Sequence, residues 1–279
     1  MHLPPLVEPG PPLGNVAIER YSRSIAMPGF GLVAQRRLAA ARVLVVGAGG
    51  LGSPVLLALA AAGVGTIGVI DGDVVELSNL QRQSIHRDED IGRGKAASAV
   101  AAIGRANPLV TAVAHPLRLD AANALEVLGG YDLVVDGTDR YASRFLVADA
   151  AAIAGLPVVW GAVSQQHAQV SVLWEAHGPG LRDLHPSAPL SETEELAGSC
   201  AEAGVLGAVC TIAGGQMAAE VVKLVTGLGE PLLGRILVTD AWTARSFEVP
   251  LERDPDRVPV TELAPEPERR ELRASRRDG

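Results

Sequence analysis

The chain has 279 residues, of which 48% are hydrophobic and only 3% aromatic, and its formal net charge at pH 7 is −8. This length suffices for one large α/β domain or two small ones, and the acidic balance argues against a protein that binds nucleic acid or a membrane surface. Two cysteines exclude a disulfide scaffold, and no signal peptide or uninterrupted membrane-spanning run is seen, so we expect a cytoplasmic protein.

Residues 1–17 are rich in Pro and Gly and predict a flexible arm, followed by a helix over 18–41. From residue 42, apolar β-branched runs alternate with segments of helix formers, which predicts a Rossmann-like, mostly parallel sheet with helices on both faces. The expected strands are 42–46, 66–71, 109–115, 131–139 and 156–163, and the expected helices are 53–63, 94–107, 121–130 and 140–155.

The alternation changes after residue 163. A strand over 167–174 follows the previous strand so closely that an antiparallel pair is expected, and residues 175–200 predict a long polar loop. A helix is expected over 204–226, and two strands, 235–240 and 244–251, predict a closing hairpin. We therefore expect an α/β domain over 18–252, extended by antiparallel strands, and a disordered tail over 253–279 because apolar residues almost vanish there.

The stretch "GAGGLG", from Gly47 to Gly52, follows a strand and opens a helix. Glycines in this context let the backbone approach phosphates, and the helix N-terminus presents free N–H groups to them. Asp71 ends the next strand, where a carboxylate can accept hydrogen bonds from ribose hydroxyls. The alternative is a packing turn without a ligand, and at this point NAD and ATP both remain open.

The stretch "LSNLQRQSIH" over 77–86 favours ATP. Release of pyrophosphate from a triphosphate needs positive charge, which Arg82 and Lys95 supply near the same sheet edge. Asn79 and Gln81 can orient phosphate oxygens and Arg82. Asp139 ends a later strand at this edge and can hold Mg²⁺ against the phosphates. The simpler interpretation of Arg82 and Lys95 is a solvated surface pair.

Together these motifs resemble the ThiF/MoeB family of ubiquitin-activating-enzyme-like adenylyltransferases over 18–252. The resemblance is carried, in the family's order, by "RYSR", "VLVVGAGGLGSPV", "GVGTIGVIDGDVVELSNLQRQ", "GRGKA", "DLVVDGTD", "SCAEAGVLG" and "GEPLLGRILVTDA". It implies that Mg-ATP adenylates the C-terminal Gly-Gly carboxylate of a small ubiquitin-fold sulfur-carrier protein, in preparation for thiocarboxylate formation. It also implies a homodimer and a separate sulfur-donor protein.

The resemblance implies roles for particular residues. Arg82 and Lys95 would stabilise the transition state, Asp139 would bind Mg²⁺, Arg23 would reach the partner subunit's active site, and Cys200 would bond covalently to the activated carrier. The alternative for Cys200 is a small buried residue, and Cys210 is expected in the core. The residues implied to bind the nucleotide are Gly47, Gly49, Gly50, Gly52, Asp71, Ser78, Asn79, Gln81, Arg82, Lys95 and Asp139.

The chain departs from the family at its zinc site. Most relatives hold a structural zinc with two C-x-x-C pairs, whose positions are occupied here by Gly180, Asp183, Arg257 and Val260. Because tetrahedral zinc needs four N or S ligands, no structural zinc is expected, and His177 and His185 are predicted to be surface residues. Arg140 replaces the family's usual Asn and can either bind a phosphate or compete for Asp139.

Three other functions remain open. One alternative is adenylation of a different carboxylate, such as a peptide C-terminus or a modified nucleoside, which the missing zinc favours. An NAD-dependent oxidoreductase is permitted by the glycine turn and Asp71 but opposed by Arg82 and Lys95. A scaffold that binds nucleotide without catalysis would have no pyrophosphate chemistry to lose when Arg82 is replaced.

Overall fold

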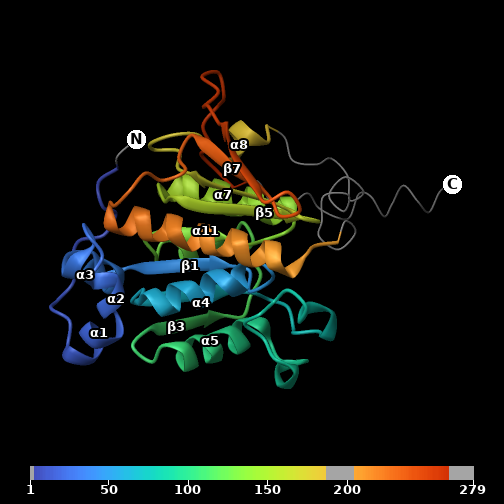
Figure 1. The fold of residues 1–279 in the computed structure, drawn as a ribbon. Coiled ribbons are helices and arrows are strands. Elements are labelled where there is room, and N and C mark those ends of the chain that lie inside the picture. Colours follow the sequence, from blue (N-terminus) through green and yellow to red (C-terminus); the bar gives the residue numbers. More distant parts are fainter. Residues whose placement is uncertain (1–2, 187–203, 264–279) are drawn as a thin grey trace.

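The computed structural model describes residues 3–186 and 204–263. Their strands form one eight-stranded sheet in the order β3-β2-β1-β4-β5-β6-β7-β8 (Figure 1). The strands are β1 (Arg42–Val46), β2 (Thr66–Ile70), β3 (Thr111–His115), β4 (Leu133–Asp136), β5 (Val158–Ser164), β6 (His167–Leu173), β7 (Arg235–Asp240) and β8 (Arg245–Pro250). The α-helices are α1 (Asn15–Arg20), α2 (Ser22–Ile25), α3 (Gly31–Ala40), α4 (Gly52–Ala62), α5 (Lys95–Ala106), α6 (Ala124–Leu128), α7 (Tyr141–Ala154), α8 (Leu181–Leu184) and α11 (Gly207–Thr226).

The first five strands are parallel, and β6, β7 and β8 add antiparallel pairs. This confirms the predicted mostly parallel sheet with an antiparallel extension. The strand order reverses between β1 and β4: the chain runs outward from β1 to β3, then returns to place β4 on the other side of β1. Such a reversal opens a crevice at the carboxyl ends of the strands, where α/β folds bind their ligands.

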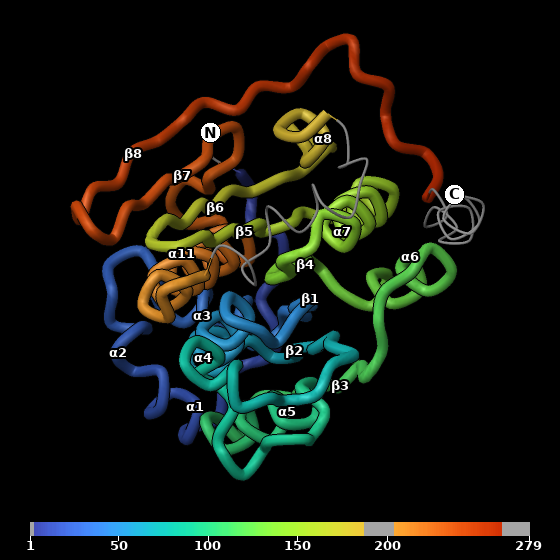
Figure 2. Tube along the Cα trace, turned by 90° about the vertical axis from the view of Figure 1, so that its right-hand side faces the viewer, coloured from blue at the N-terminus to red at the C-terminus, as the bar shows by residue number. Residues whose placement is uncertain are grey.

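Each face of the sheet has its own hydrophobic core, because successive strand residues point to opposite faces. In β1, Val43 and Val45 belong to the core shared with α4, α5 and α11, whereas Leu44 and Val46 belong to the core shared with α6 and α7. Figure 2 shows these two helical layers on either side of the strands. The β-branched residues of the parallel strands are therefore buried on both sides.

The N-terminal region differs from the prediction. The expected single helix over 18–41 is three helices, α1 to α3, because Pro28 lacks an N–H donor and Gly29 and Gly31 have left-handed φ angles of 80° and 63°. The expected flexible arm is packed as far as the structure describes it. Leu3 is buried, and the Leu6 amide donates to the Leu224 carbonyl of α11 at 3.0 Å.

Helix α11 has the length and apolar character of a membrane span, yet its contacts are those of a core helix. It packs against α4, β5 and β6, and Met217 and Val221 are fully buried. Glu220, also fully buried, accepts hydrogen bonds from Gln216 and from the Leu232 amide, both at 2.8 Å. The helix is therefore explained by the fold around it.

Candidate active site

The glycine turn lies at the point where the strand order reverses. Gly47 follows β1 with φ of 92°, and a Cβ placed there would approach the carbonyl oxygen of Gly137, after β4, to 3.1 Å. A Cβ on Gly52 would collide with the carbonyl of Gly47, so only glycine lets α4 begin so close to the strand. The turn thus brings the N-terminus of α4 to the carboxyl ends of β1 and β4.

Asp71 fixes this turn from the neighbouring strand. Its Oδ2 accepts the Ala48 amide at 2.9 Å, and its Oδ1 accepts the Asp73 amide at the same distance. The carboxylate lies at the edge of the glycine turn, where the sequence places a ribose-binding acid. Each carboxylate oxygen keeps a further lone pair with which to accept a hydroxyl.

The polar loop over 77–86 packs against the glycine turn. The Arg82 Cδ would be 3.6 Å from a Cβ on Gly50, and the Gln83 Nε2 would be 3.7 Å from a Cβ on Gly49. Arg82 donates through Nη1 to the Ser78 carbonyl at 3.1 Å, and the backbone carbonyl of Asn79 accepts the Arg82 amide. The loop therefore presents Arg82 to the turn, as the sequence predicts. Ser78 and Gln81 are exposed beside it.

Lys95 begins α5 and is buried, with its Nζ 3.6 Å from the Asp73 carboxylate. Asp73 also pairs with Arg118 at 2.7 Å. Partial burial opposes ionisation of Asp73, but the Arg118 hydrogen bond and the charges of Lys95 and Arg118 outweigh it, so the pKa of Asp73 is lowered. Asp73 thus stays ionised and holds the Lys95 ammonium two residues from Asp71.

One carboxylate ends β4 and another lies just after it, in contrasting surroundings. Asp139 is exposed, which suits a group expected to hold Mg²⁺ together with substrate phosphates. Asp136 is buried, and although Arg144 and two hydrogen bonds from Thr138 favour its ionised form, desolvation raises its pKa. Sequence analysis overlooked Asp136, although it stands in the same "DGTD" stretch and directly precedes Gly137.

His86 is a second residue that sequence analysis missed. It is buried, its Nε2 lies 2.9 Å from the Ala48 carbonyl, and its Nδ1 lies 2.8 Å from the Ser98 hydroxyl on α5. Burial lowers the pKa of His86, so the ring is neutral near pH 7 and donates from Nε2 while Nδ1 accepts from Ser98. His86 thereby connects the polar loop, the glycine turn and α5. The clue in the sequence was the position of His86 at the end of the polar loop over 77–86.

Other predicted residues lie apart from this cluster. Arg23 is exposed on α2, near Tyr21, which contacts Gly63 and Asn107 at the carboxyl ends of α4 and α5. Those helix ends lie at the sheet edge opposite the glycine turn, so this chain does not bring Arg23 into its own site. Cys200 lies outside the described residues. Cys210 is buried in the core as predicted, and its Sγ would be 3.0 Å from a Cβ on Gly50.

The absence of a structural zinc stays a prediction. Within residues 3–186 and 204–263, no group of three or more His, Cys, Asp or Glu side chains is placed to hold a metal. His177 is exposed, and its ring lies tilted against Trp174. His185 differs from its predicted surface position: it is half-buried and contacts the rings of Tyr141 and Trp160. The part of the chain described here offers no substitute for the four thiols.

Comparison with known proteins agrees with this geometry. The ThiF family model matches residues 21–260. The chain is 45% identical over 260 residues to the sulfur carrier protein adenylyltransferase of Thermus thermophilus, covering 91% of this chain and 94% of the relative. It is 50% identical over 265 residues to the probable adenylyltransferase/sulfurtransferase MoeZ of Mycobacterium tuberculosis, covering 94% of this chain and 67% of the relative.

Solved structures support the fold. MccB of E. coli with ATP superposes with a TM-score of 0.73 at 21% identity, covering 87% of this chain and 74% of MccB. PaaA gives a TM-score of 0.72 at 24% identity, covering 87% of this chain and 76% of PaaA. The matched family model and the two relatives extend over most of the sequence. The chain belongs to the ThiF family.

Proposed function

We propose that this protein uses ATP to adenylate the C-terminal Gly-Gly carboxylate of a small, ubiquitin-fold sulfur-carrier protein. The observation that carries the proposal is the contact between the glycine turn and Arg82. It occurs in a chain that is 45% identical to a sulfur carrier protein adenylyltransferase over 91% of its length. The adenylated carrier would then accept sulfur from a separate donor protein and become a thiocarboxylate.

The chemistry needs electrostatic stabilisation more than proton transfer. The carrier carboxylate is already ionised at pH 7, so it can attack the α-phosphorus without a general base. A bond forms from a carboxylate oxygen to that phosphorus, and the bond to the bridging oxygen breaks, so pyrophosphate leaves with the electron pair. Arg82 and Lys95 stabilise the negative charge that builds up on the leaving group.

The remaining residues position the nucleotide. Amides of the glycine turn and the N-terminus of α4 face the phosphates, and Asp71 accepts hydrogen bonds from the ribose. Mg²⁺, when bound with the nucleotide, neutralises phosphate charge. Asp139 is the residue that would hold it. After adenylation, the Cys200 thiolate would attack the carbonyl carbon of the carrier's acyl adenylate, forming a thioester as AMP leaves.

A homodimer would complete the site. Arg23 is far from the glycine turn of its own chain, so it can act only in the site of a second copy. The helices that carry and adjoin Arg23 expose apolar side chains, among them Val16, Met27, Leu32 and Val33. Burial of these side chains against a second copy would supply the association energy.

The test is ATP–pyrophosphate exchange with Mg²⁺, with and without a Gly-Gly carrier. Arg82→Ala is expected to abolish carrier-dependent exchange. Arg87→Ala is the matched control, because Arg87 stands just after the same loop and its guanidinium forms a solvent-exposed pair with Glu89, at 3.5 Å. Exchange that needs no carrier would point to another carboxylate substrate, and nucleotide binding without exchange would point to a scaffold.

A further inference from the structure

Two positions where the family's zinc cysteines stand, Asp183 and Arg257, meet in this structure, although neither is a cysteine. Asp183 lies in α8, within the segment after β6, and Arg257 lies in the segment after β8. The Arg257 Nε donates to Asp183 Oδ1 at 2.7 Å, and its Nη2 donates to Asp183 Oδ2 at 3.2 Å. The same Nη2 lies 2.8 Å from Glu175 Oε2. A guanidinium therefore joins the two segments that a zinc ion joins in relatives.

This cluster of Glu175, Asp183 and Arg257, here called the clasp, is largely shielded from water. The Asp183 side chain is fully buried, Arg257 is 12% exposed and Glu175 is 22% exposed. Asp183 also accepts the Gly180 amide at 2.7 Å and the Asp254 amide at 3.1 Å. Four hydrogen bonds thus satisfy its carboxylate, which makes a buried charge tolerable in a protein interior.

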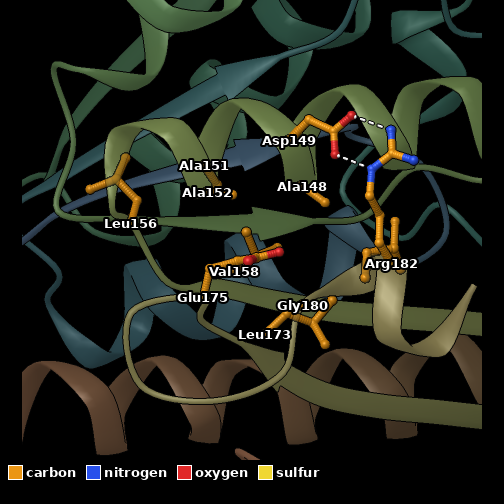
Figure 3. Close-up of a pocket in the computed structure, with 11 residues that line it drawn as sticks. Ala148, Asp149, Ala151, Ala152, Leu156, Val158, Leu173, Glu175, Gly180 and Arg182 are labelled. Carbon is orange, nitrogen blue, oxygen red and sulfur yellow. Dashed lines mark hydrogen bonds and ion pairs between the residues drawn. The ribbon is translucent and has the colours of Figure 1, made fainter. Parts of the chain in front are cut away.

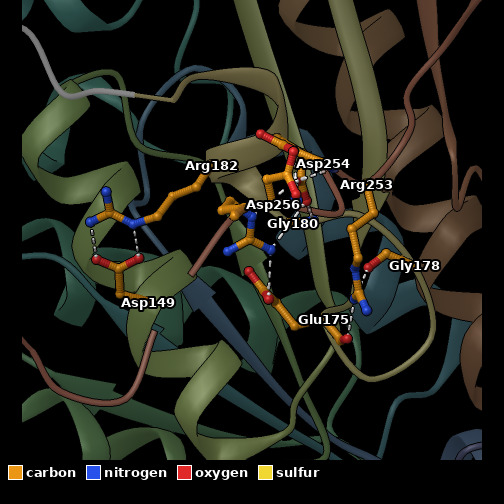
Figure 4. Close-up of polar contacts among 10 residues, drawn as sticks. Asp149, Glu175, Gly178, Gly180, Arg182, Arg253, Asp254 and Asp256 are labelled. Atoms are coloured by element: carbon orange, nitrogen blue, oxygen red, sulfur yellow. Dashed lines mark hydrogen bonds and ion pairs between the residues drawn. The ribbon is translucent and has the colours of Figure 1, made fainter. Parts of the chain in front are cut away.

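Neighbouring contacts extend the clasp on both sides (Figure 4). Arg182 forms a bidentate pair with Asp149 of α7, at 2.9 and 2.7 Å, which anchors α8 to the helix below it. Arg253 donates to the carbonyls of Glu175 and Gly178. The segment before residue 186 is therefore held to α7 on one side and to residues 253–257 on the other.

The shape of the cluster disfavours a metal. A Cβ on Gly180 would collide with Glu175 Oε1, so a side chain at 180 is excluded while Glu175 holds Arg257. Arg257 brings a positive charge to the place of a cation, and Val260 has no ligand atom. The pocket beside the cluster is lined by Asp149, Glu175 and Arg182 among apolar side chains (Figure 3), and its volume of about 10 Å³ holds no more than a water molecule.

We infer that the clasp replaces the structural zinc of the family: in this branch, Arg257 fastens the C-terminal segment to the turn before α8 by pairing with Asp183 and Glu175, and no metal takes part. The inference concerns the fold and stands apart from the proposed substrate. It also gives the segment over 253–257, predicted to be part of a disordered tail, a defined structural role.

A double-mutant cycle with Arg257→Met and Asp183→Asn tests the clasp. Arg257→Met leaves the buried Asp183 carboxylate without its cation, and Asp183→Asn leaves Arg257 with Glu175 as its remaining carboxylate. Each single variant is expected to lower Tm by about 6–20 °C. The double variant strands neither charge, so its loss of Tm is expected to be clearly smaller than the sum. Amide hydrogen exchange should accelerate over 174–185 and 250–258 in each single variant. The control Arg87→Met, which removes an exposed ion pair, should change neither Tm nor the exchange rates of these amides.

The wild-type protein supplies a test that does not depend on variants. Protein expressed with added zinc is expected to contain no stoichiometric zinc, and its Tm should be unchanged by a chelator. One zinc per chain together with a chelator-induced drop in Tm would overturn the inference. Strictly additive effects in the cycle would overturn it equally, because Arg257 and Asp183 would then not act as a pair.

Discussion

Replacement of His86 by alanine tests whether a side chain outside the phosphate site controls the glycine turn. The imidazole is buried and bonds the Ala48 carbonyl and the Ser98 hydroxyl. Its removal leaves that carbonyl with only the long 3.4 Å hydrogen bond from the Ser53 hydroxyl, at a cost of about 1–3 kcal/mol, and opens a cavity in the same place. We expect a total loss of about 2–4 kcal/mol, which for a chain of this size lowers Tm by roughly 4–16 °C.

The effect on catalysis separates positioning from stability. If about 1.4 kcal/mol of this loss is a loss of ATP binding free energy through a displaced glycine turn, KM for ATP in pyrophosphate exchange rises about tenfold. His86→Gln, whose amide can still donate to Ala48, should recover part of the KM. Ser98→Ala retains the Ala48 bond and should affect KM less than His86→Ala. An alanine variant with lower Tm but unchanged KM and kcat would refute a positioning role.

Three further outcomes are expected. Arg23→Ala and Arg82→Ala should each be inactive in pyrophosphate exchange. A mixture of the two variants that swaps subunits should regain about a quarter of the wild-type activity, because half of the dimers then hold one intact site. No recovery after confirmed subunit swapping would contradict a shared site. Gly50→Ala should lower both Tm and ATP affinity, because its Cβ would be 3.0 Å from the Cys210 Sγ. Addition of Cys210→Ala should restore Tm but not ATP affinity, as shown by thermal unfolding and KM. Finally, burial lowers the folded-state pKa of His86, His115 and His185, so below pH 6.5 the unfolded chain binds more protons than the folded one. The free energy of unfolding should therefore fall as the pH drops below 6.5. Denaturant titrations at pH 8 and 5.5 would contradict this if stability were equal or higher at pH 5.5.

Local patterns were sufficient to predict most of the sheet. Strands β1, β2 and β4 are short apolar runs that meet glycine or aspartate at their carboxyl ends, and helix α4 ends at Gly63, whose φ of 80° only glycine adopts readily. The change from parallel to antiparallel pairing after β5 also followed, because a parallel crossover and a short antiparallel connection differ in length. The division of the N-terminal region into three helices was missed, since the apolar pattern there continues across Pro28.

Site residues could be predicted where they stand close together in the sequence, in motifs whose residue types suit one chemistry. Gly47, Asp71 and Arg82 stand in motifs whose order alone suggests a phosphate site. The contacts of His86 with Ala48 and of Arg257 with Asp183 join residues far apart in sequence, and a single sequence carries no signal for such pairs. Asp136 was missed for a different reason: burial, which raises its pKa, is decided by neighbours from other strands.

The bonds between Arg257, Asp183 and Glu175 also determine how this joint responds to its surroundings. A thiolate-bound zinc is lost when the metal is scarce or when oxidants convert the thiols to disulfides or sulfenic acids. Guanidinium and carboxylate groups have no such redox chemistry, and their pairing draws on no metal supply. The joint between the two segments should therefore persist through zinc starvation and oxidative stress, conditions that would open a cysteine-based joint.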